Sequence, residues 1–152
     1  MAVSMELTGG KILKKKLEEL ADKVKNPAML RVGFFEKSRY PNGTSVAMIA
    51  AINEFGAPSR GQPPRPFFRN MITAKKGEWP SAISYLLKAN NYDAEKILGI
   101  AGSAIAGQLR QSIVDTNSPP LAPSTVKRKG FDKTLIDTSV MINSVGFEVT
   151  TK

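Results

Sequence analysis

The chain contains neither cysteine nor histidine. The absence of cysteine excludes disulfides, thiolate catalysis and cysteine-ligated metal sites. The absence of histidine excludes Ser-His-Asp triads, Cys-His pairs and histidine-ligated zinc. Any catalysis would have to use carboxylates, lysines, tyrosines or hydroxyls. The composition therefore argues against an enzyme, and we expect no catalytic residue, metal site or cofactor.

Long hydrophobic runs are also absent. No apolar segment reaches the ~18 residues that a membrane span requires, so we expect no membrane contact. The first sixteen residues have no apolar core ahead of their lysines and do not resemble a secretory signal. A cytosolic protein is the default expectation. A length of 152 residues predicts one domain, residues 1–152, in which residues 1–9 are candidates for disorder.

Acidic residues are in the minority, and the excess of basic residues is uneven. The formal net charge is +9, from 22 basic and 13 acidic residues. Residues 1–76 hold 14 basic and 6 acidic residues, whereas residues 77–152 hold 8 and 7. A basic half suggests a nucleic acid or an acidic protein as a neighbour. A solvated helix face would show the same pattern, and composition leaves both interpretations open.

Apolar periodicity and turn residues indicate an α+β fold. Residues 10–25 read as an amphipathic helix, because apolar residues recur every three or four positions from Leu13 to Val24. Residues 36–44 are turn-rich and form either a hairpin tip or a mobile loop. The prediction is a single domain with a small mixed or antiparallel sheet, several helices and long loops. Helices are predicted over residues 10–25, 46–55, about 66–76, about 79–89, 94–115 and 139–145, with strands over 29–35 and 146–151 and a short helix over 124–129 as an option.

The long predicted helix over residues 94–115 contains several small residues. Gly99, Gly102, Ser103 and Gly107 lie in its middle, and each glycine costs a helix about 1 kcal/mol relative to alanine. Close packing against a sheet would explain this cost. A helix at a subunit interface would explain it equally well.

Two motifs support competing functions. Residues 135–139, LIDTS, resemble the Asp-Thr-Gly turn of aspartic proteases, which share a proton between two carboxylates, so this single copy would require a homodimer. A helix N-cap needs only Asp or Thr at the helix start, and we favour that role for Asp137. Residues 127–129 form a basic cluster that could contact phosphates, an acidic neighbour or solvent. A DNA-binding accessory protein and a dimeric aspartic protease are therefore the alternatives that these motifs support.

Four motifs in sequence order resemble a known family. They follow the apolar VGFF segment over residues 32–35, and they are AMIAAINEFG (47–56), PPRPFFR (63–69), PPLAPSTVKRKG (119–130) and LIDTSVMINSV (135–145). Together they are similar to the neck and minor-tail proteins of tailed bacteriophages, described as virion morphogenesis, tail-completion or minor tail protein Z-like proteins. The resemblance covers about residues 30–150. The family usually has Asp-Thr-Gly where this chain has Asp137-Thr138-Ser139, which puts a glycine-dependent backbone angle there in doubt.

The resemblance implies a structural virion protein without catalytic residues. Related proteins assemble as a ring, commonly described as sixfold, between the connector or head-closure proteins and the tail-terminator or tail-tube proteins. It therefore implies a homo-oligomer located in the virion neck, assembled in the host cytoplasm. Contact with DNA in the channel would be weak and non-specific, because tight phosphate binding would obstruct ejection.

The same interpretation assigns interaction residues. Phe55 would end a helix at the subunit surface, and Pro64 and Pro66 would hold the following loop stiff. Phe67 and Phe68 would supply apolar anchors, one of them in the core and the other at or near the interface. Arg65 and Arg69 would pair with acidic groups of the neighbour. The predicted interaction residues are Phe55, Pro64, Arg65, Pro66, Phe67, Phe68, Arg69, Lys127, Arg128, Lys129 and Asp137, and the loops 36–44 and 116–134 are candidates for ordering only on assembly.

Overall fold

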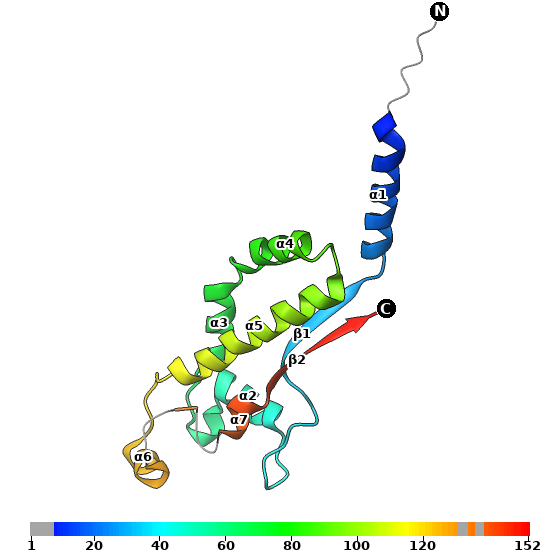
Figure 1. Cartoon of the computed structure of the whole chain (residues 1–152). Coiled ribbons are helices and arrows are strands. Elements are labelled where there is room, and N and C mark those ends of the chain that lie inside the picture. Colours follow the sequence, from blue (N-terminus) through cyan, green and yellow to red (C-terminus); the bar gives the residue numbers. More distant parts are fainter. Residues whose placement is uncertain (1–7, 131–133, 136–138) are drawn as a thin grey trace, which may run out of the picture.

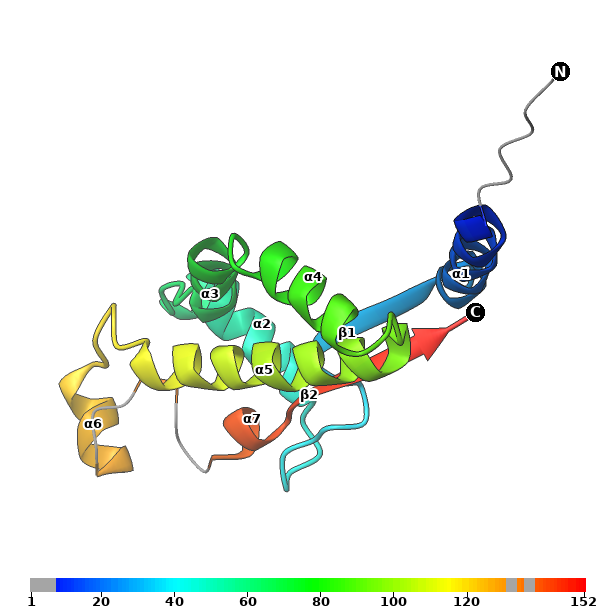
Figure 2. The ribbon, with the colours of Figure 1, turned by 45° about the horizontal axis from the view of Figure 1, so that its top comes forward.

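The longest described helix, α5 (Ala94–Asp115), packs against both strands and against helices α3, α4 and α7 (Figure 1). A computed structural model describes residues 8–130, 134–135 and 139–152. Asp93 caps α5, and its side chain accepts a hydrogen bond from the Lys96 amide at 3.1 Å. α3 (Phe67–Lys75) and α4 (Trp79–Ala89) run along α5, as the second view also shows (Figure 2).

A two-stranded antiparallel sheet lies against α5. Strand β1 (Ala28–Phe34) pairs with β2 (Val145–Thr151), with Ala28 opposite Thr151 and Phe34 opposite Val145. Two strands alone are marginally stable in water, so contact with a helix is what makes such a sheet viable. The remaining described elements are α1 (Thr8–Val24), α2 (Val46–Phe55), the 3-10 turn η1 (Pro58–Arg60), α6 (Pro123–Lys129) and α7 (Val140–Asn143).

Gly102 explains how α5 approaches the sheet so closely. An ideal Cβ at this position would lie 2.5 Å from Cδ2 of Phe147 and 2.7 Å from Cδ1 of Leu30, one side chain from each strand. An ideal Cβ at Gly99 or Gly107 would meet nothing within 4 Å. Of the two explanations left open by the sequence, close packing on the sheet therefore accounts for Gly102 and leaves Gly99 and Gly107 unexplained.

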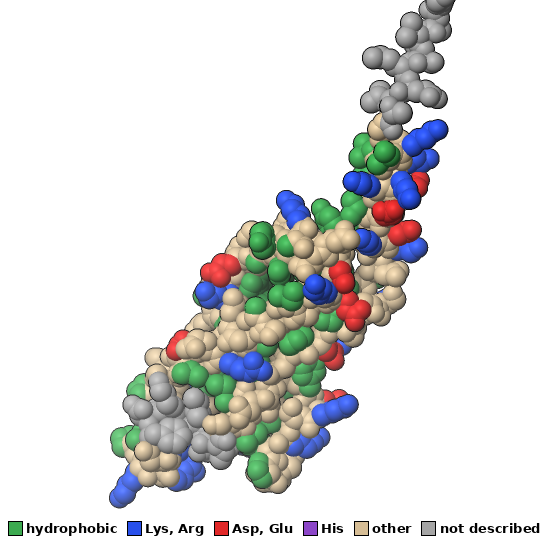
Figure 3. Space-filling model, in the orientation of Figure 1, with side chains coloured by type: hydrophobic (Ala, Val, Ile, Leu, Met, Phe, Trp, Pro, Cys, Tyr) green, Lys and Arg blue, Asp and Glu red, His purple; other side chains and the backbone are tan. Residues whose placement is uncertain are grey.

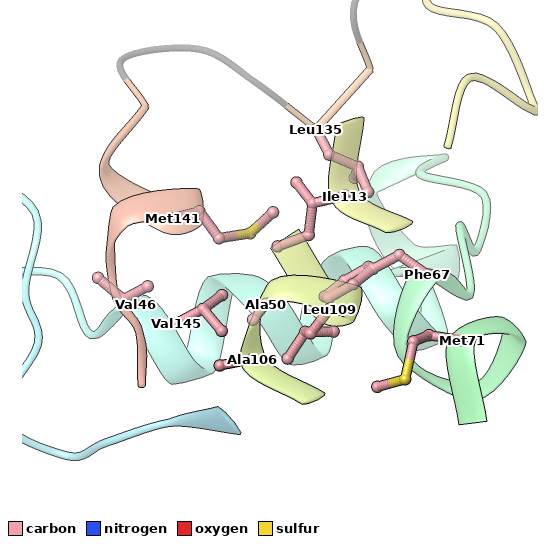
Figure 4. Packing of buried hydrophobic residues seen from close by; sticks show 10 residues of the cluster. All are labelled: Val46, Ala50, Phe67, Met71, Ala106, Leu109, Ile113, Leu135, Met141 and Val145. Atoms are coloured by element: carbon pink, nitrogen blue, oxygen red, sulfur yellow. The ribbon is translucent and has the colours of Figure 1, made fainter. Parts of the chain in front are cut away.

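The hydrophobic core lies where α2, α3, α5, α7 and β2 converge (Figure 4). Phe67, Leu109 and Ile113 are its largest members from α3 and α5, and all three are almost fully buried. Polar contacts bind the same elements together. The Ser112 hydroxyl donates to the Phe67 carbonyl at 2.6 Å, and a guanidinium nitrogen of Arg110 donates to the Val145 carbonyl at 2.6 Å.

Helix α1 stands apart from the rest of the molecule (Figures 1 and 2). Its sequence is amphipathic, as predicted, yet its apolar side chains are exposed: Ile12, Leu13, Leu17 and Val24 have relative accessibilities of 56–63%. A hydrogen bond from Lys23 Nζ to the Asn91 carbonyl, 3.3 Å long, joins it to the α4–α5 turn. The apolar face that normally holds a surface helix on its core is therefore uncovered here.

The structure confirms the predicted α+β class and most predicted elements, with ends that differ by a few residues. The last helix is shorter than predicted, because α7 spans four residues and the chain enters β2 at Val145. Of the two alternatives for residues 36–44, the structure shows the hairpin tip. Arg39 and Ser45 form an isolated antiparallel bridge, and the Gly43 amide donates to the Tyr40 carbonyl at 2.9 Å. Among the described helices, none is long and apolar enough to cross a membrane.

Candidate interface at the junction of α2 and α3

The loop between α2 and α3 is closed on itself. Gly56 ends α2 with a φ of 78°, and an ideal Cβ there would lie 2.8 Å from the backbone oxygen of Gln62 and from the nitrogen of Pro64. Ala57 and Gln62 exchange two backbone hydrogen bonds of 2.9 and 3.1 Å. The Arg65 amide then donates to the Asn53 carbonyl at 2.7 Å, which returns the chain to α2. The loop is therefore held by its own backbone as well as by its prolines.

Glu54 caps a helix that follows it by thirteen residues. Its carboxylate is 6% exposed and accepts hydrogen bonds from the Phe68 amide at 2.8 Å and the Arg69 amide at 3.2 Å. These are among the first amides of α3, which have no partner within the helix. Pro66 stands at the N-cap position and offers no side-chain acceptor. A carboxylate from α2 thus replaces the local cap, and its negative charge suits a helix N-terminus.

Arg69 ties the same two helices together from outside. Its Nε donates to Glu54 Oε1 at 2.7 Å, and a second guanidinium nitrogen donates to the Glu54 carbonyl at 3.1 Å. Its guanidinium carbon also lies 5.0 Å from the centre of the Phe55 ring, within the range of a cation–π contact. The Phe55 side chain itself is 65% exposed. A large aromatic ring is therefore presented to solvent on a rigid support.

The two phenylalanines at the start of α3 lie in different environments. Phe67 is 1% exposed and meets Phe34 edge-on, with ring centroids 6.2 Å apart. The prediction that Phe67 anchors a partner is therefore wrong, because its ring already fills the core. Phe68 is half-buried and packs against the core. The prediction that one of the pair is a core residue is confirmed, whereas an interface role for Phe68 stays a prediction.

Arg65 is an internal residue rather than a surface cation. It is 5% exposed, and it donates from Nε to the Pro119 carbonyl at 2.9 Å and from a terminal nitrogen to the Pro120 carbonyl at 3.3 Å. Burial lowers its pKa. The prediction that Arg65 pairs with acidic groups of a neighbour is wrong for this conformation, since its donors hold the loop after α5. Arg69 likewise pairs with Glu54 of its own chain.

The basic cluster and the proline loop meet at one pocket. A pocket of about 700 Å3 has Arg65 in its wall together with Arg60, Arg128 and Lys129. Within the described part of the chain, no carboxylate lines this pocket. Lys127 is exposed on the same short helix, α6, and Pro64 is exposed beside the loop. The structure thus brings together basic residues that the sequence analysis placed in separate motifs. Pro66, the remaining proline of the predicted set, is half-buried at the start of α3.

Asp137 lies outside the described residues, so the helix-cap and protease interpretations of this residue stay predictions. Ser139, where the resembling family has glycine, adopts a φ of 61°. The left-handed backbone that glycine favours is therefore present at this position with a serine. In the described ranges, there is no group of three or more Asp or Glu residues placed to hold a metal ion.

The roles of Glu54 and Arg65 could not be predicted from local sequence. Capping motifs in a sequence involve residues within a few positions of the helix start. They gave no indication that Glu54 is a cap, because the helix that it caps begins only after the loop that follows α2. Arg65 was read as a surface cation because arginine is rarely buried. A weak signal for Glu54 was its position, since it follows Val46 and Ala50 at four-residue spacing on the buried side of α2.

Comparison of the chain with protein-family models, with curated proteins and with solved structures finds no match.

Proposed function

We propose that this chain is a structural protein of a tailed bacteriophage virion. It forms a ring of copies, six by the resemblance, at the neck, where it joins the connector or head-closure proteins to the tail. It has no catalytic role and requires no cofactor. The proposal rests first on the ordered motifs of residues 30–150, all four of which contribute residues to the pocket beside the α2–α3 junction.

The observation that carries the proposal is the presentation of Phe55. Single exposed apolar side chains are common on protein surfaces, and what distinguishes Phe55, which is 65% exposed, is how its ring is held in place. Here the ring is fixed by Arg69, by the buried carboxylate of Glu54 and by the closed loop that begins at Gly56. A fixed aromatic ring loses little conformational entropy when it binds, and aromatic residues with arginine are enriched at interface centres.

The test is electron microscopy of the purified chain in negative stain over a range of concentrations. We expect rings with a central opening wide enough for duplex DNA, and we expect Phe55→Ala to abolish them without unfolding the protein. Met48→Ala is the matched control, because Met48 is an exposed apolar residue of the same helix. A chain that forms no ring and binds neither isolated phage heads nor isolated tails would contradict the proposal.

A second function, DNA binding during assembly, is favoured by the pocket that Arg60, Arg128 and Lys129 line. Several cations around one hollow would contact phosphates, and each phosphate contact steepens the dependence of affinity on salt. Duplex DNA titrated at several salt concentrations distinguishes the two functions. Tight binding that falls steeply with salt, and that is lost in Lys127→Glu/Arg128→Glu, favours DNA binding. Weak binding with a shallow slope favours the neck protein.

A further inference from the structure

The pocket beside the α2–α3 junction gathers cations and, within the described residues, no carboxylate. Arg60 lines it from the end of η1, and Arg128 and Lys129 line it from α6. Arg60 and Arg128 are exposed, and neither makes a hydrogen bond or an ion pair in the part of the chain that the structure describes. On the face that Figure 3 shows, the described side chains at the α6 end include Lys and Arg and no acidic residue. A hollow lined by charges of one sign concentrates ions of the opposite sign, so this pocket attracts an anionic ligand.

Arg65, in the wall of the same pocket, is a nearly buried cation that bonds carbonyl groups only. Its Nε and one terminal nitrogen donate to Pro119 and Pro120, and no carboxylate of the described residues pairs with it. The other terminal nitrogen makes no hydrogen bond there, yet no buried side-chain nitrogen in those ranges lacks a partner, so this atom is open to solvent. The side chain is 5% exposed, and burial lowers its pKa because the charged form has lost hydration. An anion in the pocket would therefore stabilise the charged form.

The remaining lining fits a protein segment rather than a nucleic acid. The Gln62 side-chain nitrogen donates to the Asn53 side-chain oxygen at 3.0 Å, and the Gln62 side-chain oxygen accepts no hydrogen bond within the described chain. A peptide backbone has N–H groups that suit this acceptor, whereas a sugar–phosphate backbone has none. Apolar side chains complete the wall, among them Ile49 and Leu121. A duplex carries its phosphates on the outside of a rod, which cannot place an anion against the nearly buried Arg65.

We propose that this pocket binds an acidic segment of another protein, a short extended stretch in which carboxylates alternate with apolar side chains. The carboxylates pair with the guanidinium groups of Arg60 and Arg128, whose planar forks match both oxygens of a carboxylate. One carboxylate reaches the open nitrogen of Arg65, and a backbone N–H of the segment donates to Gln62. The pocket volume of about 700 Å3 limits the segment to a few residues. The inference concerns the pocket alone and goes beyond ring formation, which microscopy measures separately.

The first part of the test is fluorescence anisotropy of the labelled peptide Asp-Glu-Leu-Glu-Asp-Leu-Glu, titrated with the full chain at physiological salt. We expect the wild type to bind it. Arg60→Gln/Arg128→Gln is expected to weaken binding at least about tenfold, because two charge-assisted contacts are lost. The matched control is Lys88→Gln/Lys96→Gln, which removes the same net charge from exposed residues of α4 and α5 outside the pocket. The control should bind the peptide like the wild type.

The second part separates a pocket from diffuse surface charge and a peptide from a nucleic acid. Thr125→Trp adds bulk to a residue that lines the pocket and changes no charge, so it should also weaken peptide binding at least about tenfold. Single-stranded oligothymidylate and duplex DNA of the same net charge as the peptide should bind more weakly than the peptide. Circular dichroism shows whether each variant keeps its helices.

Three results would overturn the inference. The first is a wild type that does not bind the peptide. The second is peptide binding by folded Thr125→Trp, or by Arg60→Gln/Arg128→Gln, that equals binding by the control. The third is an oligonucleotide that binds more tightly than the peptide and is lost in Arg60→Gln/Arg128→Gln, which would assign the pocket to nucleic acid.

Discussion

At the junction of α2 and α3, charged and aromatic side chains contact partners within the chain, whereas α1 presents Leu13, Leu17 and Val24 to solvent. Within the described residues, no buried side-chain nitrogen or oxygen lacks a hydrogen-bond partner. The two regions therefore differ in how much each contributes to the stability of the single chain. Substitutions in the body should change the free energy of unfolding, and substitutions of exposed residues on α1 should leave it almost unaltered.

The largest effect should come from a comparison of two leucines, one in the core on α5 and one on α1. Leu109→Ala removes a fully buried side chain, and we expect it to lower the free energy of unfolding by about 2–5 kcal/mol. Leu17→Ala removes an exposed side chain of α1 and should change it by less than about 0.5 kcal/mol at concentrations where the chain is monomeric. Urea unfolding followed by circular dichroism measures both. Equal losses would mean that the apolar side of α1 is covered within the chain.

Two glutamates give the next comparison. Glu54→Ala removes the cap of α3 and leaves two amides without acceptors, which we expect to cost about 2–4 kcal/mol. Most of this loss comes from the amides, because the Arg69 side chain is 57% exposed and its ion pair is screened by solvent. Glu18→Ala on α1 removes an exposed pair with Lys14 and should cost at most about 0.5 kcal/mol. A small effect at Glu54 in the same unfolding assay would refute its capping role.

Two glycines of α5 compare a helix position that is packed on the sheet with one that is open. Gly102→Ala should lower the free energy of unfolding by about 1–3 kcal/mol, because its Cβ would collide with Phe147 and Leu30. Gly99→Ala should raise it by up to about 1 kcal/mol, since the added methyl meets nothing within 4 Å and alanine favours the helix. The midpoint of thermal unfolding should therefore shift in opposite directions. A stabilising Gly102→Ala would show that α5 is not pressed onto the sheet.

Within the α2–α3 junction, the smallest effect on stability is expected at Phe55. Its replacement by alanine loses the contact with the Arg69 guanidinium and little buried area, so the free energy of unfolding should fall by about 0.5–1 kcal/mol. The same variant is expected to abolish ring formation. A loss of several kcal/mol in denaturant unfolding would instead identify Phe55 as a structural residue of the junction.

Local signals in the sequence were sufficient for most of the secondary structure. Asp93 caps α5, Ser45 caps α2 and Gly56 ends α2, each through contacts with residues a few positions away. The α+β class followed from the same signals. Periodicity also located the amphipathic helix α1, yet it could not show that the apolar side would be uncovered, because that depends on how the chain leaves α1 after Pro27.

Contacts between distant residues account for what the sequence could not predict at the candidate site. Glu54 reaches the start of α3 only because the loop from Gly56 folds back on α2. Arg65 becomes an internal residue because the segment after α5 returns to meet it at Pro119 and Pro120. Arginine and phenylalanine around the proline-rich loop were assigned to an interface, and residue type alone could not separate buried Phe67 from exposed Phe55.

Hydrogen exchange of the full chain in dilute solution tests most directly whether the apolar side of α1 lacks cover within the chain. The account predicts that amides of α1 exchange rapidly, whereas amides of the α5 segment beside Leu109 and Ile113 are strongly protected. Protection of α1 equal to that of this α5 segment would contradict the account.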